Sequence, residues 1–155
     1  MSSNRIKATR RMLALSVFAL ALTAGAYADP AALTLTPKEA VFQAADAAPA
    51  PVPGTFVMTV KSAGSQDGYV YLNSELDYRD QRNLSIEVCP AAIEPLGAKF
   101  GGALQTVLVG KNVTVSGDAL RTKITFTIEG RPTEKYYYQT HVGVCSADQV
   151  SLQTP

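Results

Sequence analysis

The sequence predicts an all-β domain with a small helical insert, and two observations support this fold class. After residue 54, short apolar segments alternate with polar residues at a period of two, which is typical of half-buried strands. Turn signals such as Asp67-Gly68 and Glu129-Gly130 separate these segments. A chain of this size fits one domain, which we expect to cover residues 55–155.

Residues 1–28 predict export. Four basic residues precede an apolar run over 12–22, and Ala26-Tyr27-Ala28 supplies the small-any-small pattern that signal peptidase accepts. Cleavage is expected after Ala28, which makes the mature protein periplasmic or secreted. The apolar run is shorter than the about 20 residues of a membrane span, so none is expected. Both an ordinary secretory signal and a twin-arginine signal at Arg10-Arg11 remain open.

The charge balance disfavours a protein that binds mainly through phosphate contacts. Residues 1–28 hold four of the 14 basic residues and none of the 13 acidic ones, so the remaining chain has ten basic residues and a net charge of −3. Proteins that bind nucleic acid non-specifically usually carry a basic excess. Charge and compartment thus disfavour nucleic acid as a partner.

Residues 29–54 are expected to form a lead-in and an Ala/Pro-rich linker. Thr36, Pro37 and Glu39 have the spacing of a helix N-cap, first turn and capping box. The Ala/Pro tract that follows over 44–54 favours an extended, semi-stiff spacer. An ordered strap across the domain is the alternative for this tract.

The strand pattern follows in order along the remaining chain. Strands are expected at 55–61, 69–72, 84–88, 112–119, 123–128 and 134–145, with a short helical stretch at 91–100. A polar connection over 73–83 joins the second and third strands.

This order of elements resembles the OB-fold, and more closely the bacterial modules related to the tRNA-anticodon-binding type. The residues that carry the resemblance are Gly68-Tyr69-Val70-Tyr71-Leu72-Asn73, Asp77-Tyr78-Arg79 and the Leu-x-Gly-Lys-x-Val-x-Val-x-Gly stretch at 108–117. The resemblance implies a five-stranded barrel over about 55–150. The strand at 123–128 would be an extra hairpin strand that lengthens the last connection.

The two cysteines are expected to form a disulfide. An oxidising compartment favours this pairing over a metal site built with His141, and no metal or other cofactor is expected. In an OB barrel the third and last strands are parallel neighbours, and strand parity points Cys89 and Cys145 outward at matching ends. The bridge would close a 57-residue loop and contribute about 4 kcal/mol in the chain-entropy model.

No catalytic set stands out in the sequence, so we expect a protein that is not an enzyme. His141 lies mid-strand with outward parity and no motif-linked nucleophile, and we expect a plain surface histidine. The 73–83 segment mixes Glu75, Asp77 and Asp80 with two arginines, but it lacks the glycine and bidentate glutamate of a calcium loop. It is expected to form either a self-neutralising tip or a ligand grip.

Exposed aromatic residues give the stronger indication of a binding surface. Tyr69 and Tyr71 alternate with inward Val70 and Leu72 on the strand that lines the ligand face of OB-folds, although cross-strand packing would also place them there. Tyr136 and Tyr138 share the parity of Val142 and are expected to pack in the core or at a barrel end. The candidate ligand-binding residues are Tyr69, Tyr71, Asn73, Asp77, Tyr78, Arg79, Arg82 and Lys111.

The sequence as a whole predicts an exported, non-catalytic binding module that recognises a cell-envelope protein or glycan. One alternative is binding of single-stranded oligonucleotides through the OB-fold face. The other is a small periplasmic hydrolase that uses His141 or the acidic loop. The fold alone does not choose among these functions.

Overall fold

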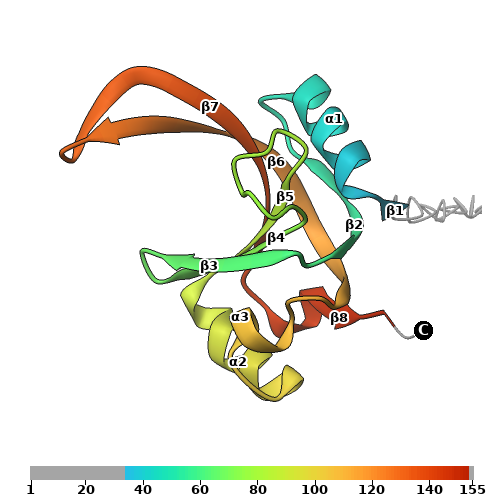
Figure 1. Cartoon of the computed structure of the whole chain (residues 1–155). Helices are drawn as coiled ribbons and strands as arrows, with labels where there is room; N and C mark the ends of the chain where they lie inside the picture. Colours follow the sequence, from blue (N-terminus) through green and yellow to red (C-terminus); the bar gives the residue numbers. More distant parts are fainter. Residues whose placement is uncertain (1–33, 154–155) are drawn as a thin grey trace, which may run out of the picture.

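The computed structural model describes residues 34–153, which form one mixed, eight-stranded sheet with helices packed around it (Figure 1). The strands are β1 (Thr34–Leu35), β2 (Val52–Thr59), β3 (Ser62–Gln66), β4 (Tyr69–Asn73), β5 (Leu84–Val88), β6 (Asn112–Ile128), β7 (Arg131–Val144) and β8 (Val150–Leu152). The helices are α1 (Pro37–Ala47), α2 (Pro90–Phe100) and α3 (Leu104–Val107), with a short 3-10 turn at Ala147–Gln149. The predicted signal segment lies outside the described residues.

The strands pair in the order β1-β2-β6-β7-β5-β4-β3, and β8 pairs with β6. The third strand of the meander, β5, lies parallel to the long strand β7, as the OB-like order predicts. Only Val60 and Lys61 separate β2 from β3, and there the backbone changes partners. Val60 N donates to Lys111 O (2.9 Å) and Lys61 N donates to Asn73 O (2.8 Å). One bent stretch of chain therefore contributes strands near both ends of the pairing order.

The core lies on the inner face of this sheet. Its largest fully buried side chains are Phe56, Leu72, Leu84, Ile86, Leu96, Leu104 and Leu108. The inward residues of β4 and β5 follow the predicted period of two, because Val70, Leu72, Ile86 and Val88 are all buried. Helices α2 and α3 cover one end of the sheet, and α1 lies toward the other end (Figure 1). Among residues 34–153, no helix has the length and apolar character to cross a membrane.

Helix α1 confirms the predicted N-terminus. Thr36 is the N-cap, its hydroxyl accepts from Glu39 N, and Glu39 accepts in return from the Thr36 backbone. Ala40 and Ala44 are fully buried, and β2 begins at Val52, where it pairs with Ala119 of β6. The described part of the expected lead-in and linker, residues 34–54, therefore packs against the rest of the sheet.

The extra strand expected at 123–128 is not separate, because β6 runs without a break from Asn112 to Ile128. Gly117 lets this long strand pass close to β7, since a Cβ there would lie 3.0 Å from Val142 Cγ1. Beyond about residue 120, β6 and β7 form a two-stranded ribbon that projects from the body (Figure 1). We call residues 120–140 the ribbon.

The expected packing of two ribbon tyrosines is wrong. Tyr136 is 50% exposed and Tyr138 is 39% exposed. Both share the parity of buried Val142, as the alternation predicts, but β7 has left the body of the sheet where they lie. Strand parity determines the face of the strand on which a side chain lies. The side chain is buried only where another element packs against that face.

The predicted disulfide is confirmed. Cys89 follows β5 and Cys145 follows β7, their Cα atoms are 5.2 Å apart, and Cys89 N donates to Val144 O (2.9 Å). The bridge fastens the parallel strands β5 and β7 at matching ends, on the outward face that parity assigned to both cysteines.

Candidate binding face

The outward face of β4, β5 and β7 brings the candidate tyrosines together with residues from distant parts of the chain. Cross-strand register places Tyr71 between Gly64 of β3 and Glu87 of β5, and places Glu87 next to Gly143 of β7. We call this surface the tyrosine face; its members are Gly64, Tyr69, Tyr71, Glu87, Tyr137, Gln139, His141 and Gly143.

Two glycines leave Tyr71 and Glu87 free of neighbouring side chains in their row. A Cβ built on Gly64 or on Gly143 would meet no heavy atom within 4 Å. Both glycines are exposed, whereas Tyr71 and Glu87 are half-buried. The row thus forms a ridge of one aromatic and one carboxylate side chain with open space on either side.

The two tyrosines of β4 form a short aromatic platform. The ring centroids of Tyr69 and Tyr71 are 6.4 Å apart, and those of Tyr71 and His141 are 5.9 Å apart in an edge-to-face arrangement. Burial, followed by the negative charges of Glu87 and Asp67, raises the pKa of the Tyr71 phenol. The hydroxyl therefore stays protonated and can donate a hydrogen bond to a ligand.

A chain of polar groups lies beside this platform. His141 Nδ1 lies 2.6 Å from Glu87 Oε2, and His141 Nε2 lies 2.7 Å from Gln139 Oε1. Gln139 Nε2 in turn donates to the Tyr137 hydroxyl (3.0 Å). The expectation of a plain surface histidine is wrong, because only 12% of the His141 side chain is exposed and its partner Glu87 lies on the neighbouring parallel strand.

Within residues 34–153, the hydrogen-bond partners of the His141 ring are the side chains of Glu87 and Gln139. Both ring nitrogens of His141 are occupied by oxygen atoms of Glu87 and Gln139. A general base needs a free ring nitrogen within reach of a hydroxyl or thiol. In the described structure these hydrogen bonds hold the side chains of Glu87, His141 and Gln139 in fixed relative positions.

The disulfide borders the tyrosine face. Val70 pairs with Val88, and Val88 pairs with Val144, so the continued register places Tyr69 opposite Cys89 and Cys89 beside Cys145. Burial also raises the pKa of the Tyr137 phenol, at the opposite end of the same face. The face therefore runs from the covalent bridge to the base of the ribbon.

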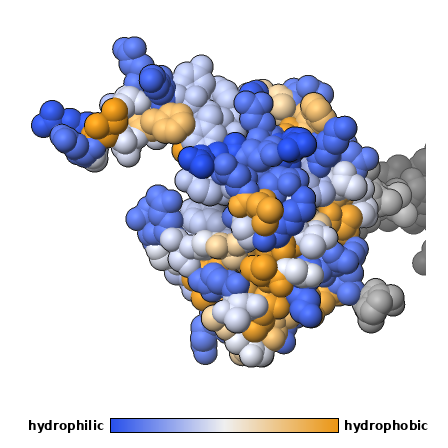
Figure 2. Space-filling model, in the orientation of Figure 1, coloured by the Kyte–Doolittle hydropathy of each residue, from blue (hydrophilic) through white to orange (hydrophobic). Residues whose placement is uncertain are grey.

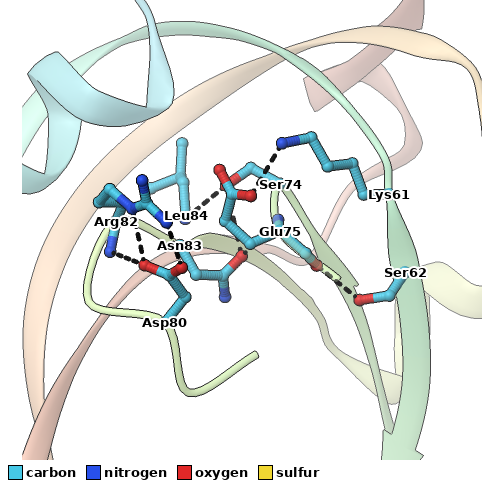
Figure 3. Close-up of polar contacts among 8 residues, drawn as sticks. All are labelled: Lys61, Ser62, Ser74, Glu75, Asp80, Arg82, Asn83 and Leu84. Atoms are coloured by element: carbon cyan, nitrogen blue, oxygen red, sulfur yellow. Dashed lines mark hydrogen bonds and ion pairs between the residues drawn. The ribbon is translucent and has the colours of Figure 1, made fainter. Parts of the chain in front are cut away.

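The 74–83 loop is fastened by Asn83, and Figure 3 shows the Asn83 side chain bonded to Glu75 within the loop. The side-chain carbonyl of Asn83 accepts from Glu75 N (3.0 Å) and from the Ser74 hydroxyl (3.3 Å). Its amide nitrogen donates to Ser85 Oγ (2.9 Å) and Asn73 Oδ1 (3.2 Å). Asn83 is only 2% exposed, so the loop is fastened from inside.

Asn73 is part of this buried network. It is 5% exposed, and its Oδ1 also accepts from Ser85 Oγ (2.7 Å). Among the candidate ligand-binding residues, the structure therefore places Asn73 beneath the loop, where it supports the site from within.

Two local ion pairs repeat along the loop. Asp77 pairs with Arg79 (3.0 Å) and Asp80 pairs with Arg82 (2.7 Å), each across two residues. Hydrogen bonds from Arg82 hold the pKa of the Asp80 carboxyl at about 2, below its usual 3.8, and Arg79 likewise lowers the pKa of Asp77. These pairs match the self-neutralising tip that was one of the two expectations for the segment.

Tyr78 and Lys111 differ in their relation to the tyrosine face. Tyr78 is 52% exposed, and its carbonyl oxygen accepts from Gln139 Nε2 (3.3 Å), which joins the loop to the face. Lys111 lies before β6 with its backbone bonded to Val60, and within residues 34–153 it makes no polar contact with the tyrosines of β4. The structure brings Tyr69 and Tyr71 together, joins Tyr78 to the face through Gln139, and leaves Lys111 apart.

Comparisons with known proteins assign no family. No protein-family model matches the sequence, and no curated protein matches it significantly. A solved structure of a protein described as an aspartyl-tRNA synthetase from Leishmania major Friedlin has a similar backbone path, with a TM-score of 0.44 and 11% sequence identity. The match covers 86% of this chain and 23% of that chain, so this chain spans about a quarter of that protein's length. This likeness assigns neither a family nor an activity.

Proposed function

We propose that the protein is an exported, non-catalytic binding module whose tyrosine face recognises an oligosaccharide of the cell envelope. The single observation that carries the proposal is the ridge of Tyr71 and Glu87 between two exposed glycines. Export rests on the predicted signal segment, and the disulfide supports an oxidising compartment.

The chemistry of the face suits a sugar. A sugar ring presents apolar C–H groups that pack on an aromatic ring, and hydroxyls that bond to planar polar groups. Tyr69 and Tyr71 offer ring surface with a polar tip, while Glu87 and Gln139 offer fixed acceptors and donors. We take the bent β2–β3 stretch to close an OB-type barrel, a fold that binds oligosaccharides on this surface.

The charge of the face favours a neutral ligand over a polyphosphate. The eight residues of the tyrosine face include Glu87 and contain no lysine or arginine. The nearby arginines at 79 and 82 are already paired with aspartates of the same loop. A single-stranded nucleic acid needs cations along its backbone, so it fits this face poorly.

The test is a calorimetric titration of the processed, oxidised protein, purified after expression of the full chain, with neutral hexose and N-acetylhexosamine oligomers. At least one oligomer should bind, and Tyr71→Ala should weaken that binding about tenfold, since stacking area and a hydroxyl are both lost. Gly143→Leu should block the ridge without disturbing the core, because the space at Gly143 is open. Tyr136→Ala, on the ribbon's other face, is the matched control.

Four results would count against the glycan. Failure of every neutral oligomer to bind removes it, as does binding that neither Tyr71→Ala nor Gly143→Leu changes. Binding of short single-stranded DNA or RNA, measured by fluorescence anisotropy and lost steeply with added salt, would favour the oligonucleotide function instead. Cross-linking of an envelope protein through a photoreactive residue at position 69, without sugar binding, would favour a protein ligand.

A further inference from the structure

The side of the ribbon opposite the tyrosine face borders a groove that is rich in basic and aromatic residues, whereas the tyrosine face contains no lysine or arginine. The volume of the groove is about 460 Å³, and its lining residues are Lys38, Val41, Phe42, Ala45, Gln81, Arg82, Arg121, Tyr136, Tyr137, Tyr138 and Thr140. We call it the basic groove. Its walls are one face of α1, the end of the 74–83 loop, and the face of β7 that carries Tyr136 and Tyr138.

Aromatic side chains of the groove are exposed and are covered by cations. The Arg121 guanidinium lies 3.9 Å from the centroid of the Tyr138 ring. The Lys123 ammonium lies 4.2 Å from the Tyr136 ring, and on the opposite wall Lys38 lies 5.9 Å from the Phe42 ring. Stacking on a ring restrains each cation while leaving its hydrogen-bond donors free.

These cations are not neutralised by the protein. Within residues 34–153, Lys38, Arg121 and Lys123 form no ion pair with a carboxylate, in contrast to Arg82, which pairs with Asp80. The groove lining contains three basic residues and no acidic residue. In a chain that carries net negative charge after residue 28, this concentration of unpaired cations favours an anionic occupant.

We propose that the basic groove binds an acidic peptide segment of a partner protein, with an apolar side chain seated between α1 and the ribbon. The lining combines tyrosine and arginine, which are enriched among protein–protein hot spots, with phenylalanine, which is enriched at interfaces. The cations already cover the ring faces on which sugars or bases would stack. A concave site of this volume accepts a few side chains and does not fit a flat membrane surface.

The first experiment uses a short fluorescein-labelled peptide in which glutamate alternates with leucine and phenylalanine. Fluorescence anisotropy should show that the processed, oxidised protein binds this peptide, and that it does not bind the same peptide with lysine in place of glutamate. Binding should weaken as salt rises, because the attraction is partly electrostatic.

A pair of charge-matched variants tests the location. Arg121→Gln should weaken peptide binding about tenfold, which is the loss expected for one charge-assisted hydrogen bond. Lys135→Gln removes the same charge from a ribbon residue that does not line the groove, and it should leave the affinity within about twofold. Neither residue is buried, so circular dichroism should show both variants folded.

The proposal is independent of the tyrosine face and fails separately from it. Equal binding of the acidic and basic peptides would overturn it, as would equal loss in Arg121→Gln and Lys135→Gln. Loss on Tyr71→Ala with no loss on Arg121→Gln would move the peptide to the other site. Tighter binding of a polyuronate or an oligothymidylate than of the peptide would overturn the choice of ligand class.

Discussion

Asn83 shows how much of the loop depends on one buried amide. Its nitrogen faces the oxygens of Asn73, Ser85 and Tyr78, and its oxygen faces donors of Ser74 and Glu75. The amide supplies a donor on one side and an acceptor on the other, a combination that a carboxylate does not offer.

Asn83→Asp is therefore expected to lower the free energy of unfolding by about 2–4 kcal/mol, since a buried carboxylate would face oxygen acceptors. Urea denaturation measures the change. Asn112→Asp is the control, because Asn112 is exposed, and its effect should stay within about 0.5 kcal/mol. Equal stability of the two variants would show that Asn83 does not organise the loop.

The ionisation of Asp80 is expected to make the stability of the protein depend on pH in the acidic range. Its pKa lies at about 2 in the folded protein and at its usual 3.8 when unfolded, because Arg82 stabilises the charged form. The pair thus contributes stability above pH 3.8, and that contribution is lost as pH falls toward 2. Between these values Tm should fall less steeply in Asp80→Asn and in Arg82→Gln than in the parent. Unchanged slopes in both variants would contradict the assignment.

Sequence reasoning placed Tyr69 and Tyr71 on the outward face of β4, and the pairing of β4 with β5 puts them there. It missed Glu87 and Gln139 as members of the same face, and it left His141 as an isolated surface residue. Glu87 and His141 are 54 positions apart and meet only because β5 lies parallel to β7. The OB-like strand order and strand parity were sufficient to predict this contact, since the same two considerations predicted that Cys89 and Cys145 would meet.

Among the elements, the ribbon shows that a period of two predicts the face on which a side chain lies but not whether that face is covered. The alternation gave the correct faces for Tyr136, Tyr138 and Val142. It did not show where β6 and β7 leave the body, because a strand carries the same pattern whether or not another layer covers it. The break expected between residues 119 and 123 is absent, because β6 runs continuously from Asn112 to Ile128.

Shortening the ribbon should leave the body folded. No residue from 121 to 139 is buried, so joining Thr122 to Gln139, which are paired in register, through an Asn-Gly turn removes no core side chain. The free energy of unfolding should change by about 1 kcal/mol or less, and binding of the acidic peptide should be lost. A collapse of the thermal transition would show that the ribbon supports the core.

Removing the disulfide tests the link between β5 and β7. Closing a loop with a sequence separation of 56 is expected to stabilise the protein by about 4 kcal/mol, so Cys89→Ser with Cys145→Ser should lower the urea midpoint strongly. Sugar binding should weaken more than peptide binding, because the bridge borders the tyrosine face. Equal weakening of both would indicate general unfolding.

At the scale of the whole molecule, polar and apolar residues are distributed unevenly. Figure 2 shows hydrophilic residues gathered near the centre of the view and both kinds of residue along the projecting ribbon. The ribbon holds four basic and two acidic residues, whereas the chain after residue 28 is negative overall. One face of the ribbon therefore contributes residues to the tyrosine face, whose members include no lysine or arginine. The opposite face contributes residues to the basic groove.

The two sites should bind their ligands at the same time. Saturating the protein with a sugar oligomer is expected to change the affinity for the acidic peptide by no more than about twofold, since the ligands contact opposite faces of β7. Sequential calorimetric titrations in both orders measure this. Mutual exclusion would mean that one surface serves both ligands, with Tyr137, which lies in the groove lining and on the tyrosine face, as the shared contact.

The position of the disulfide determines when the tyrosine face would be completed during maturation of the protein. With the export proposed above, newly made chains would carry two thiols in a reducing compartment, and there the strands that bear Tyr71, Glu87 and His141 would lack their crosslink. Oxidation after transport would then complete the sugar-binding surface as a late step of maturation. A precursor retained inside the cell would bind such ligands weakly. Tight ligand binding would then be confined to protein that has been exported and oxidised.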